Sequence, residues 1–168
     1  MSSNVIRILP LPLETRVVTA VASGTGTAIG GGTGVSAAGG IGYVTINNGN
    51  VYAYNHANAL GIPTSAIGGA GSRDQKGNLA EVTINGGNVY AFSGLGTAIG
   101  AGSSAKKEGG NATVHINDGI VVAKSGVISA GIGGGNSCTN NTTNYSGGNA
   151  TIIIGEFGNP IVRTGSIG

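Results

Sequence analysis

Apolar and polar residues alternate over short runs that recur along the chain, each followed by a turn and a second short run. The run "VTINGGNVYAF" at 82–92 has close copies at 44–54 ("VTINNGNVYAY") and at 114–124 ("VHINDGIVVAK"). Alternation with a period of two is typical of strands that have one buried face, and no apolar stripe of helical period runs for ten residues or more. The pattern therefore predicts an all-β protein.

The repeat consists of three segments. The first segment is an apolar-x-apolar strand, the second is a strand that follows an Asn-Gly or Asp-Gly turn, and the third is Gly-rich with one Ile. Equivalent isoleucines of the first segment are 38, 32 and 38 residues apart (Ile46, Ile84, Ile116, Ile154), and those of the third are 38, 32 and 33 apart (Ile29, Ile67, Ile99, Ile132). Periods of this length indicate a repeat architecture.

An Asn-Gly turn between two strands also signals a hairpin. A hairpin would leave the third segment without a partner, whereas a coil with one period per turn pairs every segment with its copies above and below. Equivalent side chains then stack about 4.8 Å apart, so Asn47, Asn85 and Asn117 are expected to form a ladder of amide hydrogen bonds. We therefore predict a single-stranded parallel β-helix, a solenoid of four to five rungs of 32–38 residues.

Both ends of the sequence keep the phase of the repeat. Ile6 and Ile8 fit a first segment and residues 18–21 fit a second, while the last residues give a first segment, an altered turn and a second segment. We treat the chain as one solenoid domain (1–168), with an atypical first rung (1–32), regular repeats (33–154) and a truncated last rung (155–168).

A solitary solenoid needs caps, because an open rung displays unpaired N–H and C=O groups. The sequence shows no capping helix, so we expect subunits to stack end to end through a heterologous contact that grows a filament. Proline and charge near the N-terminus argue the other way, because both are also used to blunt sheet edges (Pro10, Pro12, Arg7, Glu14, Arg16). A capped monomer and a piece of a longer protein are the alternatives.

Composition removes several classes of protein. Of 168 residues 35 are Gly and only 8% are charged, but Gly does not fall on every third position, and the recurring β-branched runs argue against disorder. A net charge of +2 is too small for a phosphate-tracking surface, and no run approaches the roughly 20 apolar residues of a membrane span. We predict no nucleic-acid partner, no membrane insertion and, with Cys138 as the single cysteine, no internal disulfide.

The recurring "AIGGG … VTINGGNVYA" resembles the Gly-rich right-handed β-helix repeats of bacterial surface proteins and of modules described as carbohydrate-binding, over residues 20–155 or so. The resemblance implies a right-handed coil at the cell surface with adhesive or polysaccharide-binding roles. Related folds include polysaccharide lyases that use calcium. This chain has only six acidic residues and no recurring acidic cluster, so we predict no catalytic residue, no metal site and no cofactor.

Four of the seven aromatic residues fall at alternate positions of two successive second segments (Tyr52, Tyr54, Tyr90, Phe92). With Val and Ala facing inward, these rings face outward and form one aromatic patch. Exposed aromatic surface of this kind marks a site where sugar rings stack or another subunit packs. The alternative is that stacking between rungs merely stabilises the sheet.

The sequon asparagines and the two histidines give two further predictions. Five asparagines begin an N-x-[ST] sequon and are possible glycosylation sites (Asn111, Asn140, Asn141, Asn144, Asn149). His56 and His115 are single imidazoles without Cys, Asp or Glu at ligand spacing. We therefore expect solvated or packing histidines.

Taken together, the sequence predicts a non-enzymatic structural protein that associates with itself into an extracellular filament or surface appendage. A carbohydrate-binding or adhesion module that uses the aromatic patch is a second hypothesis, with a polysaccharide as the partner. A virion or tail component is a third hypothesis, since no signal peptide is visible in the sequence.

Overall fold

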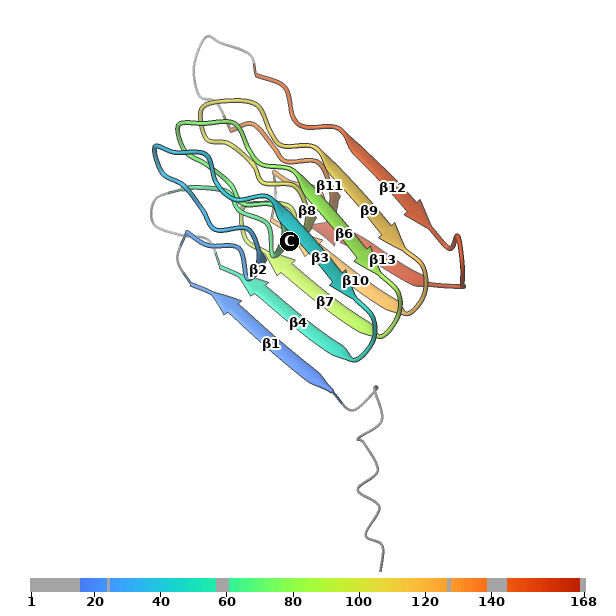
Figure 1. Ribbon diagram of the computed structural model, residues 1–168. Helices are drawn as coiled ribbons and strands as arrows, with labels where there is room; N and C mark the ends of the chain where they lie inside the picture. The colour runs from blue at the N-terminus through green and yellow to red at the C-terminus, as the bar shows by residue number, and fades with distance from the viewer. Residues whose placement is uncertain (1–15, 24, 57–60, 127, 139–144, 167–168) are drawn as a thin grey trace, which may run out of the picture.

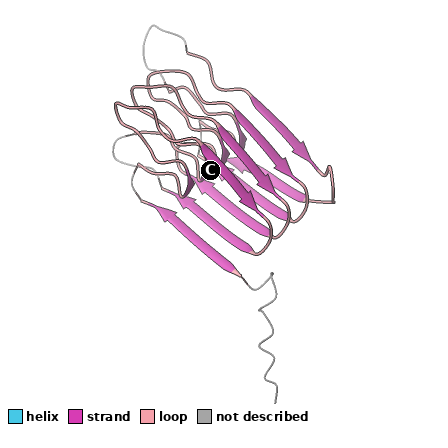
Figure 2. Ribbon diagram, in the orientation of Figure 1, coloured by secondary structure: helices cyan, strands magenta, loops and turns pink. Residues whose placement is uncertain are grey.

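The protein is described by a computed structural model that places residues 16–23, 25–56, 61–126, 128–138 and 145–166. These residues form strands and loops and no helix (Figure 2).

Sheet 1 is built from the first segments: β3 (Gly42–Ile46), β6 (Ala80–Ile84), β9 (Ala112–Ile116) and β12 (Ala150–Ile154). Sheet 2 is built from the second segments: β1 (Val17–Ala22), β4 (Asn50–Asn55), β7 (Asn88–Ser93), β10 (Ile120–Ser125) and β13 (Ile161–Ser166). Sheet 3 is built from the third segments: β2 (Ile29–Gly30), β5 (Ile67–Gly68), β8 (Ile99–Gly100) and β11 (Ile132–Gly133).

Every strand pairs in parallel with its own copies one period away. The strand orders are β12-β9-β6-β3, β1-β4-β7-β10-β13 and β11-β8-β5-β2, so the chain passes through the three sheets in turn as it coils (Figure 1). The predicted parallel β-helix solenoid is confirmed. The hairpin is excluded, because β3 and β4 lie in different sheets and the Asn-Gly turn joins sheet 1 to sheet 2.

The register places like residues on like residues. Ile46, Ile84 and Ile116 are paired in one column of sheet 1. In sheet 2 the alanines of successive turns are paired in the same way (Ala53, Ala91, Ala123). A slip of one residue would turn each inward column to solvent, so the alternating pattern fixes the register.

The core is a thin column of Val, Ile and Ala side chains. Sheet 1 contributes Val and Ile, sheet 2 contributes Val and Ala, and sheet 3 contributes Ala and Ile. In the middle turns Val82, Ile84 and Ala91 are 0–1% exposed. Small inward residues let three sheets close around a narrow interior, which explains how few aromatic residues the chain needs.

Glycine is required where the turns approach each other in sheet 3. Gly68 and Gly100 have φ of +127° and +141°, a region that L side chains rarely adopt. A Cβ on Gly68 would lie 2.1 Å from the carbonyl oxygen of Gly100, and a Cβ on Gly100 would lie 2.0 Å from that of Gly133. The Gly-rich third segments therefore permit close packing between turns.

Candidate functional site

The C-terminal end of the described solenoid exposes core side chains. Ile152 and Ile154 are paired in register with Val114 and Ile116 of the preceding turn. They are 41% and 51% exposed, whereas Val114 and Ile116 are 0% exposed. The inward column of sheet 1 thus ends in a pair of isoleucines that no described residue covers.

The N-terminal end of the described solenoid is open in the same way. Val18 is paired with Val51 and occupies the same inward column, but it is 52% exposed while Val51 is 6% exposed. Within the described residues, β1, β2 and β3 each pair with one strand only, as do β11, β12 and β13 at the other end. Each end therefore presents one unpaired strand edge from each of the three sheets.

The terminal strands carry few of the features that natural edges use to prevent pairing. Strands β1, β3 and β12 contain neither proline nor a charged residue, and Arg163 is the charged residue of β13. Lysine, proline and bulges are the usual protection of an edge. Of the residues that favour a cap, Arg16 is exposed beside β1. The other four lie outside the described residues (Arg7, Pro10, Pro12, Glu14).

The turn between sheets 1 and 2 changes in the last rung. Residues 155–160 join β12 to β13, where three residues suffice in each earlier turn. Phe157 of this longer turn is 79% exposed. Nδ1 of His115 lies 3.9 Å from Oε2 of Glu156, a weak surface contact between the last turn and the one before it.

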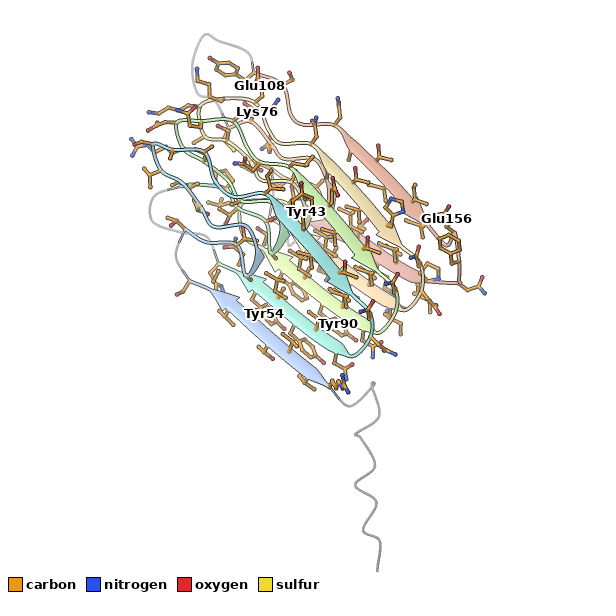
Figure 3. The ribbon with its side chains drawn as sticks, viewed as in Figure 1. Tyr43, Tyr54, Lys76, Tyr90, Glu108 and Glu156 are labelled. Carbon is orange, nitrogen blue, oxygen red and sulfur yellow. The ribbon has the colours of Figure 1, made fainter. Side chains whose placement is uncertain are left out.

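The four aromatic residues of the predicted patch lie together on the outer face of sheet 2 (Figure 3, where Tyr54 and Tyr90 are labelled). The rings of Tyr52 and Tyr90 stack with centroids 5.0 Å apart and planes 6° from parallel. Tyr54 and Phe92 stack at 5.2 Å and 7°. One face of each ring therefore lies against its stacked neighbour, and on the other side the next position of the same column is occupied by Thr19, Val21, Val122 or Lys124. Such stacking stabilises the sheet and also makes a rigid, half-buried surface.

The asparagine ladder lies along the turns between sheets 1 and 2. Nδ2 of Asn85 donates to Oδ1 of Asn47 at 2.8 Å, and Nδ2 of Asn117 donates to Oδ1 of Asn85 at 2.8 Å. A second, shorter ladder joins Asn88 to Asn50 at 2.8 Å. The last rung has Gly155 at the ladder position, so the ladder ends at Asn117.

A buried polar column was missed from the sequence. Asn55, Ser93 and Ser125 are paired in register at the end of the sheet 2 strands and are at most 5% exposed. Nδ2 of Asn55 donates to the carbonyl of Ser65 at 2.9 Å, and Oγ of Ser93 donates to the carbonyl of Thr64 at 2.9 Å. These side chains fasten the loops that lead to sheet 3. The signal was the recurrence of a small polar residue in the sixth position of four of the five second segments, since β1 has Ala22 there.

The loops that join sheet 3 to sheet 1 stack along one corner. Parallel bridges link Gly34, Ser72, Ser104 and Ser137 in sequence. Six of the twelve described Lys, Arg, Asp and Glu residues lie here, including Lys76 and Glu108, whose Nζ and Oε2 are 4.0 Å apart (Figure 3). The corner is a solvated surface held by ion pairs between successive turns.

Asp74 is the best-connected charge of this corner. Nζ of Lys106 lies 2.7 Å from its Oδ1, and Nε of Arg73 lies 3.9 Å from the same atom. The hydrogen bond from Lys106 is the main reason that the pKa of Asp74 is lowered; burial opposes it, and the positive charges of Lys106 and Arg73 add to it. Oppositely charged neighbours favour the ionised carboxylate.

Two of the five sequon asparagines lie in the described residues at this corner. Asn111 and Asn149 are exposed and occupy equivalent positions before β9 and β12. Oδ1 of Asn111 accepts a hydrogen bond from the backbone N–H of Asn149 at 3.0 Å. Asn140, Asn141 and Asn144 lie outside the described residues. The two described sequons are accessible, and each also takes part in the stacking of the loops.

The remaining candidate groups are isolated. His56 is exposed and His115 is half-buried. Over the described ranges, no three His, Cys, Asp or Glu residues form a group that could hold a metal ion. Cys138 is unpaired and half-buried, and burial raises the pKa of its thiol. The part of the chain that the structure describes contains no helix that is long and apolar enough to cross a membrane.

Comparison of the chain with protein-family models, with curated proteins and with solved structures found no match. The fold and the arrangement of the residues are therefore the basis for a functional proposal.

Proposed function

We propose that the protein is a non-enzymatic structural subunit that joins end to end into an extracellular filament or surface appendage. The observation that carries this proposal is the exposed section of the core at both ends of the described solenoid, with Ile154 51% exposed at one end and Val18 52% exposed at the other. Full burial of such a side chain is worth about 1.5–3 kcal/mol. The unpaired backbone groups of the edge strands add a directional preference for another β-strand.

The two ends match each other as sheet edges. The terminal strands of sheet 1 have five residues each, those of sheet 2 have six and those of sheet 3 have two. A second copy placed in the same direction continues sheet 2 with a parallel strand and brings the edges of sheets 1 and 3 into line. Because two different surfaces meet, this contact is heterologous and does not close, so copies add without limit.

The number of strands in each sheet determines which strand positions are filled when two copies join. Sheet 2 has five described strands, whereas sheets 1 and 3 have four. Pairing β13 with β1 of the next copy therefore leaves room for one further strand in sheet 1 and one in sheet 3. Residues 5–8 ("VIRI") have the sequence pattern of a first segment, and they lie outside the described structure.

The resemblance of the repeat to Gly-rich β-helix repeats of bacterial surface proteins supports a cell-surface location. A virion or tail component would use the same joint in another setting. The partner in either setting is a further copy of this chain.

A second candidate function is carbohydrate binding or adhesion through the aromatic patch. The observation in its favour is that Tyr52, Tyr54, Tyr90 and Phe92 lie on one half-buried face of sheet 2. The outer edges of the stacked rings would form the surface that contacts a sugar. A glycan array with the wild type and with the Tyr52→Ala/Tyr90→Ala variant tests this function. The function requires that the wild type binds a glycan on the array and that the variant does not.

Electron microscopy of the purified protein, with light scattering on a sizing column, tests end-to-end association. We expect thin filaments of uniform width in the wild type. The double variant Ile152→Lys/Ile154→Lys places two cations on the exposed end of the core, where the free subunit tolerates them and the joint does not. We expect this variant to be monomeric with an unchanged circular dichroism spectrum.

The matched control is Ile153→Lys, which lies on the same strand but points away from the core. This variant should still form filaments. A wild type that stays monomeric at all concentrations, or a control that loses filaments as fully as the double variant, would overturn the proposed joint.

A further inference from the structure

The outer face of sheet 2 is more apolar than the outer face of sheet 1. Its outward positions alternate with the buried ones in β1, β4, β7, β10 and β13, and nine of these fifteen positions carry an aliphatic or aromatic residue. Val17, Val21 and Ile161 are 61%, 59% and 50% exposed. The outer face of sheet 1 is different, because four of its eight outward positions are threonine and one is Glu81. Of these two faces, sheet 2 therefore carries the apolar surface.

The charges of this face are of one sign. Lys124 and Arg163 are exposed at its C-terminal end, and none of its outward positions carries a carboxylate. The bulky rings lie on β4 and β7, whereas β10 offers the smaller Ile120 and Val122. The face is therefore asymmetric in both size and charge along the axis of the coil.

One subunit offers too little area on this face to hold a partner. Five strands about 4.8 Å apart, with six residues that rise about 3.3 Å each, give a footprint of about 500 Å². A standard stable interface buries about 800 Å² on each partner. Two subunits joined end to end exceed this area, and each further subunit adds to it, because the contacts become intramolecular once the first pair has formed.

We propose that two filaments pair laterally through the outer faces of sheet 2, with their axes antiparallel. This inference rests on the proposed end-to-end function, which makes the face continuous from one copy to the next. Packing of two sheets face to face, about 10 Å apart, is the ordinary way to bury such a surface.

Charge and size select the antiparallel arrangement. With parallel axes, each strand faces its own copy, and Arg163 opposes Arg163. With antiparallel axes centred on β7, strand β4 faces β10 and β1 faces β13, so Arg163 opposes Thr19. Lys124 then lies over Tyr54, a contact that a cation and an aromatic ring favour. Tyr52 opposes the smaller Val122, which lets the two faces interlock.

Electron microscopy of filaments from three proteins tests this pairing. We expect wild-type filaments of twice the width of a single solenoid. The variant Val122→Glu places a carboxylate on β10, opposite Tyr52 in the paired face and not on a terminal strand, and should give filaments of single width. The matched control Thr83→Glu carries the same charge on the outer face of sheet 1 and should leave the width doubled.

Chemical cross-linking tests whether the axes of the two paired filaments are antiparallel. In a Cys138→Ser background, a mixture of Tyr52→Cys and Val122→Cys proteins should be joined by a short bifunctional maleimide into dimers between filaments. Val122→Cys alone should not be joined, because Val122 faces Tyr52 in the antiparallel pairing centred on β7 and faces its own copy when the axes are parallel. Cross-linking of Val122→Cys alone would overturn the antiparallel arrangement.

The possible failures are distinguishable. If no protein forms filaments, both the end-to-end function and the pairing fall. If wild-type filaments have the width of a single solenoid, or Val122→Glu does not change a doubled width, only the pairing falls. If Val122→Glu abolishes binding to a glycan array and leaves the width unchanged, the face is a sugar site and the pairing is wrong.

Discussion

Ile154 is paired in register with Ile116 of the turn below it, yet Ile154 is 51% exposed and Ile116 is 0% exposed. The two side chains are identical and occupy the same inward column, so their difference comes only from the presence or absence of a further turn. The difference in exposure between Ile154 and Ile116 therefore shows how much burial a further turn provides. A copy of the chain that covers Ile154 would supply the contacts that Ile116 already has.

The first prediction compares truncation of these two isoleucines. Ile116→Ala removes a fully buried side chain and leaves a cavity, so we expect it to lower the free energy of unfolding by about 2–5 kcal/mol. Ile154→Ala loses less buried area and leaves no closed cavity, so we expect about 1 kcal/mol or less in the isolated subunit. Chemical denaturation of monomeric protein measures both. Equal losses would show that Ile154 is covered in the subunit.

The second prediction concerns the close approach of turns in sheet 3. Gly100→Ala would place a Cβ 2.0 Å from the carbonyl oxygen of Gly133 at φ +141°. The backbone conformation alone costs about 1–3 kcal/mol for a residue other than Gly, and the clash adds to this. We expect a clear loss in the thermal midpoint. Gly32→Ala is the matched control, since no atom lies within 4 Å of its Cβ, and it should unfold like the wild type.

The third prediction concerns the asparagine ladder. Asn85 takes part in two side-chain hydrogen bonds and Asn47 in one. A net hydrogen bond contributes about 0.5–1.5 kcal/mol, and exposure places these at the lower end. Asn85→Ala should therefore lower the free energy of unfolding by about 1 kcal/mol, and Asn47→Ala by about half as much. Urea denaturation of the two variants gives the comparison, and a larger loss for Asn47→Ala would contradict a role for the ladder in stability.

The repeat allowed the coil, its three sheets and their register to be predicted, because residues that recur at equal spacing must meet in a parallel stack. Ile46, Ile84 and Ile116 define one column by their spacing alone. The outward direction of Tyr52 and Tyr90 followed from the inward direction of Val51 and Val89 in the same way.

Features that depend on three-dimensional contacts were harder to predict from the sequence. The stacking of Tyr52 on Tyr90 depends on rotamers that the sequence does not specify. The buried role of Asn55 was missed because Asn usually belongs to turns, whereas here the loop carbonyl groups of Thr64 and Ser65 give its amide partners inside the protein. The pairing of Lys106 with Asp74 is different, because it joins equivalent positions of two loops of equal length (69–79 and 101–111), so the 32-residue spacing of the repeat could have predicted it.

The fourth prediction uses that ion pair. The hydrogen bond from Lys106 lowers the pKa of Asp74 below its ordinary value of 3.8. A lowered folded-state pKa contributes stability above the unfolded-state pKa, and this contribution is lost as the pH falls through the folded-state pKa. Carboxyl NMR titration should therefore place the midpoint of Asp74 below 3.8, and Lys106→Gln should raise it. The control Lys76→Gln removes a cation that lies 4.0 Å from Glu108 and should leave the midpoint of Asp74 unchanged. A midpoint that does not respond to Lys106→Gln would show that the two loops do not stack in solution as they do in the structure.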